Sequence, residues 1–168
     1  MRSPTLGEVS IPKIAEVIRD RVTSQSGEYN VMIGTDSQNF DKTKMVLVVA
    51  LHHVGHGGIF FYEIQHVNKI TNIGQKLIYE TNLSLDLASK LVSEFERLKA
   101  DGFDYSKYIN IGIHVDAGEN GPSKQVIPEI VGWIKACGYE AIVKPNSYAA
   151  SSIANKYKIG RASCRERV

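Results

Sequence analysis

The chain has 168 residues, of which 43% are hydrophobic and 23% charged, an ordinary composition for one soluble globular domain. No apolar run is long enough to span a membrane, and residues 1–13 lack the apolar stretch of a signal peptide. The two cysteines, Cys137 and Cys164, have no metal-type spacing. They argue against a disulfide scaffold and favour a reducing, cytoplasmic location.

The end of the chain, GRASCRERV (160–168), has the character of a vector-derived tail, which leaves 1–159 as a single domain. This tail accounts for the net charge of +2: removing its three Arg and one Glu from the 20 basic and 18 acidic residues leaves 17 of each. Global charge therefore does not favour nucleic-acid binding. Any attraction to a polyanion must come from a local patch or from metal ions.

The first half of the chain predicts one helix and three strands. An amphipathic helix is expected over 10–23, where Ser10 fits an N-cap and Pro12 fits the first turn. Short linkers between the strands favour antiparallel hairpins. The three strand-like segments are 30–35, 44–54 and 59–67.

The second half of the chain alternates helices and strands, beginning with a long helix capped by Thr71 or Asn72. The expected order is helix 73–99, strand 108–115, helix 123–136, strand 140–144 and a last helix beginning near Tyr148. Three antiparallel strands followed by two β-α units predict an α/β fold. Its mixed five-stranded sheet would carry helices on both faces, in addition to the N-terminal helix.

Two aspartates end apolar, strand-like runs: Asp36 follows YNVMIGT, and Asp116 follows YINIGIHV. In a sheet of this order the strand after the long helix lies parallel beside the first, so both carboxylates are expected at one sheet edge. Helical phase places Glu80 on the apolar stripe of the long helix, from which it can reach both. Each Asp alone also fits a turn or helix cap, and Glu80 also fits an ion pair with Lys76. Three crowded carboxylates repel one another, so Mg²⁺ or Mn²⁺ is the expected neutraliser.

Four motifs and the order of elements resemble the YkuK-like group of ribonuclease H-related proteins, within the ribonuclease H-like superfamily. The motifs are IGTDSQ (33–38), IYETNLSLDLA (78–88), IHVDAGENGPSK (113–124) and VKPNSYAASSIANK (143–156). The resemblance implies a ribonuclease H-like fold and a nuclease or related nucleic-acid-processing protein, with metal ligands at Asp36, Glu80 and Asp116. In the wider fold a fourth acid usually follows the last strand. Here that region offers Asn146, which can ligate a metal but carries no charge.

A nuclease of this kind would hydrolyse phosphodiester bonds of RNA, DNA or a hybrid through two metal ions, with the three acids as catalytic residues. Ser37, Lys124 and Lys144 are the expected phosphate contacts. Tyr148 fits either a base-stacking role or the start of the last helix. The expected partner is nucleic acid rather than a membrane, and the sequence leaves the oligomeric state undefined.

Two other interpretations stay open. The missing acid after the last strand and the neutral charge balance favour a catalytically inactive module that binds nucleic acid or protein. Alternatively, the acids only cap turns in a structural protein. A zinc site is disfavoured, because adjacent residues His52 and His53 on one strand point to opposite faces of the sheet and cannot easily share a metal.

Overall fold

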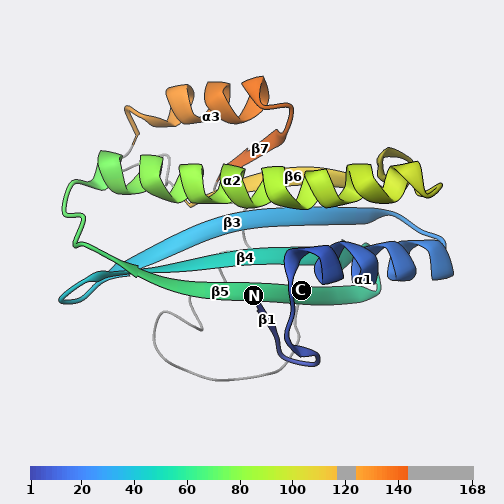
Figure 1. Cartoon of the computed structure of the whole chain (residues 1–168). Coiled ribbons are helices and arrows are strands. Elements are labelled where there is room, and N and C mark those ends of the chain that lie inside the picture. The colour runs from blue at the N-terminus through green and yellow to red at the C-terminus, as the bar shows by residue number, and fades with distance from the viewer. Residues whose placement is uncertain (117–123, 144–168) are drawn as a thin grey trace.

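The computed structural model describes residues 1–116 and 124–143. Their elements are β1 (Arg2–Ser3), β2 (Gly7–Glu8), α1 (Ile11–Ser24), β3 (Tyr29–Asn39), β4 (Thr43–His53), β5 (Gly57–Val67), α2 (Ile73–Ala100), the 3₁₀ helix η1 (Tyr105–Lys107), β6 (Ile109–Val115), α3 (Ile127–Ala136) and β7 (Glu140–Val143). Within these residues the strands form one mixed sheet of order β2-β1-β5-β4-β3-β6-β7 (Figure 1). The five expected strands are β3 to β7. Two further strands of two residues each extend the sheet beyond β5, through the pairing of Arg2 with Tyr62.

Strands β3, β4 and β5 are antiparallel, as their short linkers predict, whereas β6 and β7 run parallel to β3. The first strand is longer than predicted: it continues to Asn39 instead of ending at Thr35. The reason is cross-strand pairing, since β3 matches β4 residue for residue as far as Asn39 opposite Thr43. The Phe40 N–H then donates to the Lys42 carbonyl at 2.8 Å and closes the hairpin.

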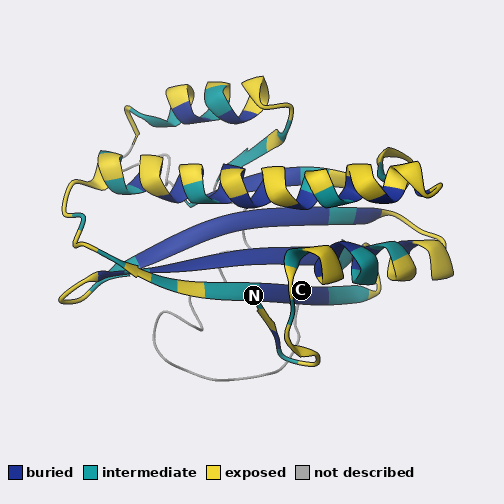
Figure 2. Ribbon diagram, in the orientation of Figure 1, coloured by how far each residue is buried: buried dark blue, intermediate teal, exposed yellow. Residues whose placement is uncertain are grey.

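Side-chain alternation divides the central strands between two apolar faces. On one face, Val31 and Ile33 of β3 belong to a core that also receives buried side chains from α1, α2 and α3. The other face carries a smaller cluster, formed by Met32, Val46, Val48, Ala50 and Phe60. Figure 2 shows α2 turning its buried side toward the sheet and its exposed side away from it. The described helices therefore all pack on one face, and the expected helix near Tyr148 lies outside the described residues.

Local sequence explains where each helix begins. The Ser10 hydroxyl accepts from the Lys13 N–H at 3.3 Å, and the Asn72 side chain, rather than Thr71, accepts from the Gln75 N–H at 2.9 Å. Helix α3 begins at Ile127 instead of about residue 123, with Pro128 in its first turn, where the missing N–H of proline costs no hydrogen bond. None of the helices in the described parts of the chain is long and apolar enough to cross a membrane.

Candidate functional site

Strand register brings two of the predicted acids to the same level of the sheet. Gly34 of β3 is the last residue paired with β6, opposite His114. Asp36 and Asp116 each lie two residues further along these neighbouring parallel strands, which places them at the same level of the sheet. Asp116 directly follows β6, whereas Asp36 lies inside β3, opposite Val46 of β4. The prediction that Asp36 ends its strand is therefore wrong, because the β3–β4 hairpin extends beyond it.

The long helix α2 supplies the third acid. Glu80 is 6% exposed and lies on the buried stripe of α2, as its helical phase predicts. Two polar contacts join this part of the helix to β3: the Ser37 hydroxyl donates to the Glu80 carboxyl, and the hydroxyls of Thr35 and Ser84 are 2.8 Å apart. These bonds satisfy polar groups that would otherwise be buried without partners, so they hold α2 at a defined height above β3.

The three acids line one pocket, which we call the carboxylate pocket. It has a volume of about 170 Å³ and is lined by Asp36, Ser37, Ile73, Lys76, Leu77, Glu80 and Asp116. Asp36 is 7% exposed, which makes it nearly as buried as Glu80. Lys76 is the cation of this lining, one helical turn before Glu80 on α2. Residues distant in the sequence thus enclose a small, acid-rich space beside apolar side chains.

Burial and charge crowding raise the pKa of Glu80 from its ordinary value of 4.5 to about 8. Desolvation by burial is the largest cause, and the charges of Asp36 and Asp116 raise the pKa further. The hydrogen bond from Ser37 and the positive charge of Lys76 act in the opposite direction, but do not cancel the rise. With no cation in the pocket, burial and the neighbouring carboxylates therefore favour the protonated form of Glu80.

The carboxylate oxygens of this pocket are the type of ligand that Mg²⁺ and Mn²⁺ prefer. Their side chains do not form a ready-made cluster: within residues 1–116 and 124–143, no three His, Cys, Asp or Glu side chains are grouped so that they could hold a metal ion. Binding a cation through Glu80 would require this carboxyl to lose its proton and exchange its hydrogen bond with Ser37. The residues that would hold it are Asp36, Glu80 and Asp116.

The remaining predicted site residues fall into three groups. Ser37 lines the carboxylate pocket. Lys124 is exposed in the turn before α3 and does not belong to that lining. Lys144, Asn146 and Tyr148 lie outside the described residues.

The sequence suggested Lys76 only as an alternative ion-pair partner for Glu80, and did not predict it as part of the site. In the structure Lys76 lines the pocket and interacts electrostatically with Glu80, although no ion pair between these two described side chains is formed. The available signal was the spacing of four residues on one helix, which places both side chains on the same face.

Comparison with known proteins agrees with the fold. The family model "Ribonuclease H-like" matches residues 13–158. The "Uncharacterized protein YkuK" of Bacillus subtilis (strain 168) is 31% identical over 135 residues, which cover 77% of this chain and 78% of that protein.

Among solved structures, the catalytic domain of the Mos1 mariner transposase covers 96% of this chain, with 14% identity and a TM-score of 0.39. The same domain with raltegravir and Mg shows 13% identity and a TM-score of 0.38. The extent of the family match and the identity to YkuK, rather than these distant structures, decide the classification. The chain belongs to the ribonuclease H-like family, and within it to the YkuK-like group.

Proposed function

We propose that the protein is a metal-dependent nuclease that hydrolyses phosphodiester bonds of RNA, DNA or a hybrid at the carboxylate pocket. The observation that carries this proposal is the convergence of Asp36, Glu80 and Asp116 on one small pocket, in which Asp36 and Glu80 are buried. Membership of the ribonuclease H-like family supports it. Burial of carboxylates such as Asp36 and Glu80 destabilises a fold, as the raised pKa of Glu80 indicates, so an arrangement of this kind favours a functional role.

The chain's own residues would divide the work by position. Asp36 lies on the central strand β3 and would contribute to holding both ions, while Glu80 and Asp116 would each hold one. When bound, divalent ions would lower the pKa of a coordinated water and stabilise charge on the leaving oxygen. The Ser37 hydroxyl and the Lys76 ammonium line the same pocket, where they can contact phosphate oxygens. Ile73 and Leu77 are the apolar residues of the same lining.

The decisive experiment measures cleavage of labelled RNA, DNA and hybrid oligonucleotides by purified protein with Mg²⁺, Mn²⁺ or EDTA. We expect cleavage that requires a divalent ion and that Asp36→Asn abolishes. A matched control is Asp86→Asn, which removes an acid from the exposed side of α2, where Asp86 pairs with Lys90 at 3.0 Å. Metal-dependent cleavage that persists unchanged in purified Asp36→Asn protein contradicts the proposal.

A second function, nucleic-acid or protein binding without catalysis, is favoured by one specific observation. Glu80 is hydrogen-bonded to Ser37, burial raises its pKa, and the described side chains contain no group of three acids, histidines or cysteines that could hold a metal ion. A binding module would retain affinity for an oligonucleotide in EDTA and show no cleavage with any divalent ion. Robust metal-dependent turnover that Glu80→Gln abolishes would exclude this alternative.

A further inference from the structure

A second pocket lies at the opposite end of the central strands. This histidine pocket has a volume of about 470 Å³ and is lined by Arg21, Ser24, Gln25, Tyr29, Leu51, His53, His56, Gly58 and Ile59. It is formed where β3 begins at Tyr29, β4 ends at His53, and β5 begins at Gly57. Tyr29 and Asp36 are seven residues apart on one strand, so the two pockets are separated by roughly 23 Å. The histidine pocket is therefore distinct from the carboxylate pocket.

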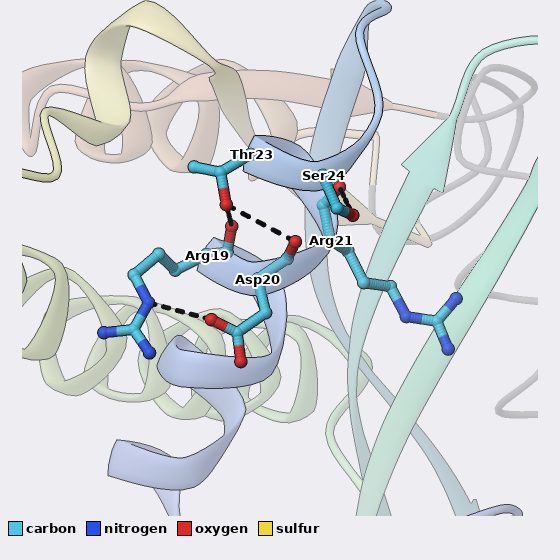
Figure 3. Close-up of polar contacts among 5 residues, drawn as sticks. All are labelled: Arg19, Asp20, Arg21, Thr23 and Ser24. Atoms are coloured by element: carbon cyan, nitrogen blue, oxygen red, sulfur yellow. Dashed lines mark hydrogen bonds and ion pairs between the residues drawn. The ribbon is translucent and has the colours of Figure 1, made fainter.

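Arg21 supplies the positive charge of this pocket. Its neighbour Arg19 donates to Asp20 at 3.0 Å, and Figure 3 shows the Arg21 side chain extending to the other side of α1, away from that pair. Among the described residues the Arg21 guanidinium has no hydrogen bond or ion pair. A guanidinium presents five N–H donors in a planar fork that matches the oxygens of a phosphate.

Three aromatic rings form a stack along the wall of the pocket. The Tyr29 and His53 rings have centroids 4.2 Å apart and planes inclined by 19°, and the His53 and His56 rings are 4.2 Å apart with planes inclined by 20°. The Tyr29 hydroxyl donates to the Gln25 carbonyl at 2.9 Å, which holds the inner end of the stack. His56, the outer ring, is exposed. A stack that ends in an exposed ring offers a surface for a planar nucleobase.

His53 is the buried, central ring of this stack. This side chain is 9% exposed, and its Nε2 has no hydrogen-bond partner among the described residues. The imidazole fits only because residue 27 is glycine, since a Cβ at Gly27 would lie 2.4 Å from Nε2. Because Nε2 lies against Gly27, which does not line the pocket, the surface that the stack offers to a ligand is the exposed ring of His56.

The positive charge of Arg21 makes an anionic ligand the best match for this pocket. Within its described lining, Arg21 faces no Asp or Glu, and the Ser24 hydroxyl and Gln25 amide add neutral polar groups. The C-terminal carbonyls of α1 oppose an anion, but the Arg21 carbonyl already accepts from the Gln25 N–H and the Ser24 hydroxyl. A second role for Arg21, compensation of the α1 dipole, requires only a positive charge. Anion recognition requires the guanidinium fork, and this difference makes the two roles separable.

We infer that the histidine pocket binds a nucleotide, with its phosphate on Arg21 and its base stacked on the outer face of His56. This site needs neither the divalent ion nor the acids of the proposed nuclease. It differs from a general electrostatic surface, because it recognises a phosphate and a planar base together.

The test is calorimetric titration in EDTA with three probes: inorganic phosphate, adenosine 5′-monophosphate and adenosine. The nucleotide should bind more tightly than either phosphate or the nucleoside. Arg21→Ala should weaken nucleotide binding about tenfold, which corresponds to about 1.4 kcal/mol. His56→Ala should reduce the preference for nucleotide over phosphate. Arg21→Lys should retain the thermal stability of the protein while losing most of this affinity.

Arg19→Ala is the matched control, because it removes a guanidinium from the same helix that is already paired with Asp20. Equal affinities of the Arg19→Ala and Arg21→Ala proteins for the nucleotide would overturn the inference. The absence of nucleotide binding at a concentration of about 10 mM would also overturn it, since a site with a millimolar Kd would be mostly filled there. Metal-dependent cleavage of a short oligonucleotide should be unaffected by Arg21→Ala. Failure of this site is thereby distinguished from failure of the carboxylate pocket.

Discussion

The two ends of the central strands carry opposite chemistry on the same framework. At one end, Asp36, Glu80 and Asp116 line a pocket of about 170 Å³ in which Lys76 is the cation. At the other end, Arg21 and two histidines line a pocket of about 470 Å³ whose described lining contains no acid. The sheet between them is apolar on both faces.

The fold keeps the acids and the arginine in two separate pockets. Excess negative charge at the carboxylate pocket is relieved by protonation, since the pKa of Glu80 rises to about 8. At the histidine pocket, the buried Nε2 of His53 has no hydrogen-bond partner among the described residues. The described lining of one pocket thus has an excess of acids, and that of the other has an arginine and no acid.

The largest effect is expected from removing charge at the carboxylate pocket. Asp116→Asn should lower the rate of metal-dependent cleavage on the order of 10³-fold, because a bound metal contributes several kcal/mol to stabilising the transition state. Single-turnover kinetics on a labelled oligonucleotide measures this loss. Arg21→Ala, at the other end of the strands, serves as the contrast and should keep the wild-type rate. Similar losses in both variants would show that the two ends do not act separately.

A second prediction concerns the pH dependence of stability in EDTA. The pKa of Glu80 is about 8 in the folded protein against 4.5 ordinarily, so its contribution to stability is complete below about pH 4.5 and is lost as the pH rises through 8. Glu80→Gln keeps a neutral side chain at every pH. The difference in unfolding free energy between variant and wild type should therefore shift in favour of the variant by on the order of 2–4 kcal/mol from pH 5 to pH 9.

Urea denaturation at several pH values measures this difference, and subtraction cancels groups that titrate equally in both proteins. A flat difference across the range would mean that Glu80 is ionised in the folded protein. The charge-crowded description of the carboxylate pocket would then be wrong. Adding Mn²⁺ should reduce the pH dependence of the wild type, because a cation replaces the proton as the neutralising partner.

A third prediction addresses the histidine pocket. Gly27 has φ +145°, and a Cβ there would lie 2.4 Å from the His53 Nε2, so Gly27→Ala should destabilise the protein by about 1–3 kcal/mol and displace the imidazole. Gly55→Ala provides the control for backbone strain alone, since Gly55 has φ +80° and no atom within 4 Å of an added Cβ. Chemical shifts of the His53 ring should change in the first variant and not in the second.

The smallest expected effect lies at the polar contact between β3 and α2. Ser84→Ala removes one of two buried hydroxyls that are 2.8 Å apart and should cost about 1 kcal/mol of unfolding free energy, because Thr35 loses this partner. Thr23→Ala removes an exposed hydroxyl on α1 and should change stability by less than about 0.5 kcal/mol. Equal effects in thermal denaturation would indicate that the Thr35–Ser84 contact does not help to position α2.

Local sequence was sufficient to predict most of the elements. Ser10 and Asn72 mark helix starts because their short side chains accept backbone N–H groups, and helical phase alone put Glu80 on the buried stripe of α2. The limits of β3 and α3 were predicted less well. Strand β3 continues to Asn39 because of its pairing with β4, and such cross-strand pairing cannot be detected from one segment.

The sequence by itself determined that three acids would occur on β3, on α2 and at the end of β6, since periodicity and chain order are local properties. Only the tertiary structure decided that Lys76 shares their pocket, that Glu80 is hydrogen-bonded to Ser37, and that burial raises the pKa of Glu80. It alone also joined Arg21 to His53 and His56; the sequence had suggested His53 only as a candidate zinc ligand, together with His52. The physical reason is that burial and electrostatic coupling depend on distances across the fold, and residues remote in the chain set those distances.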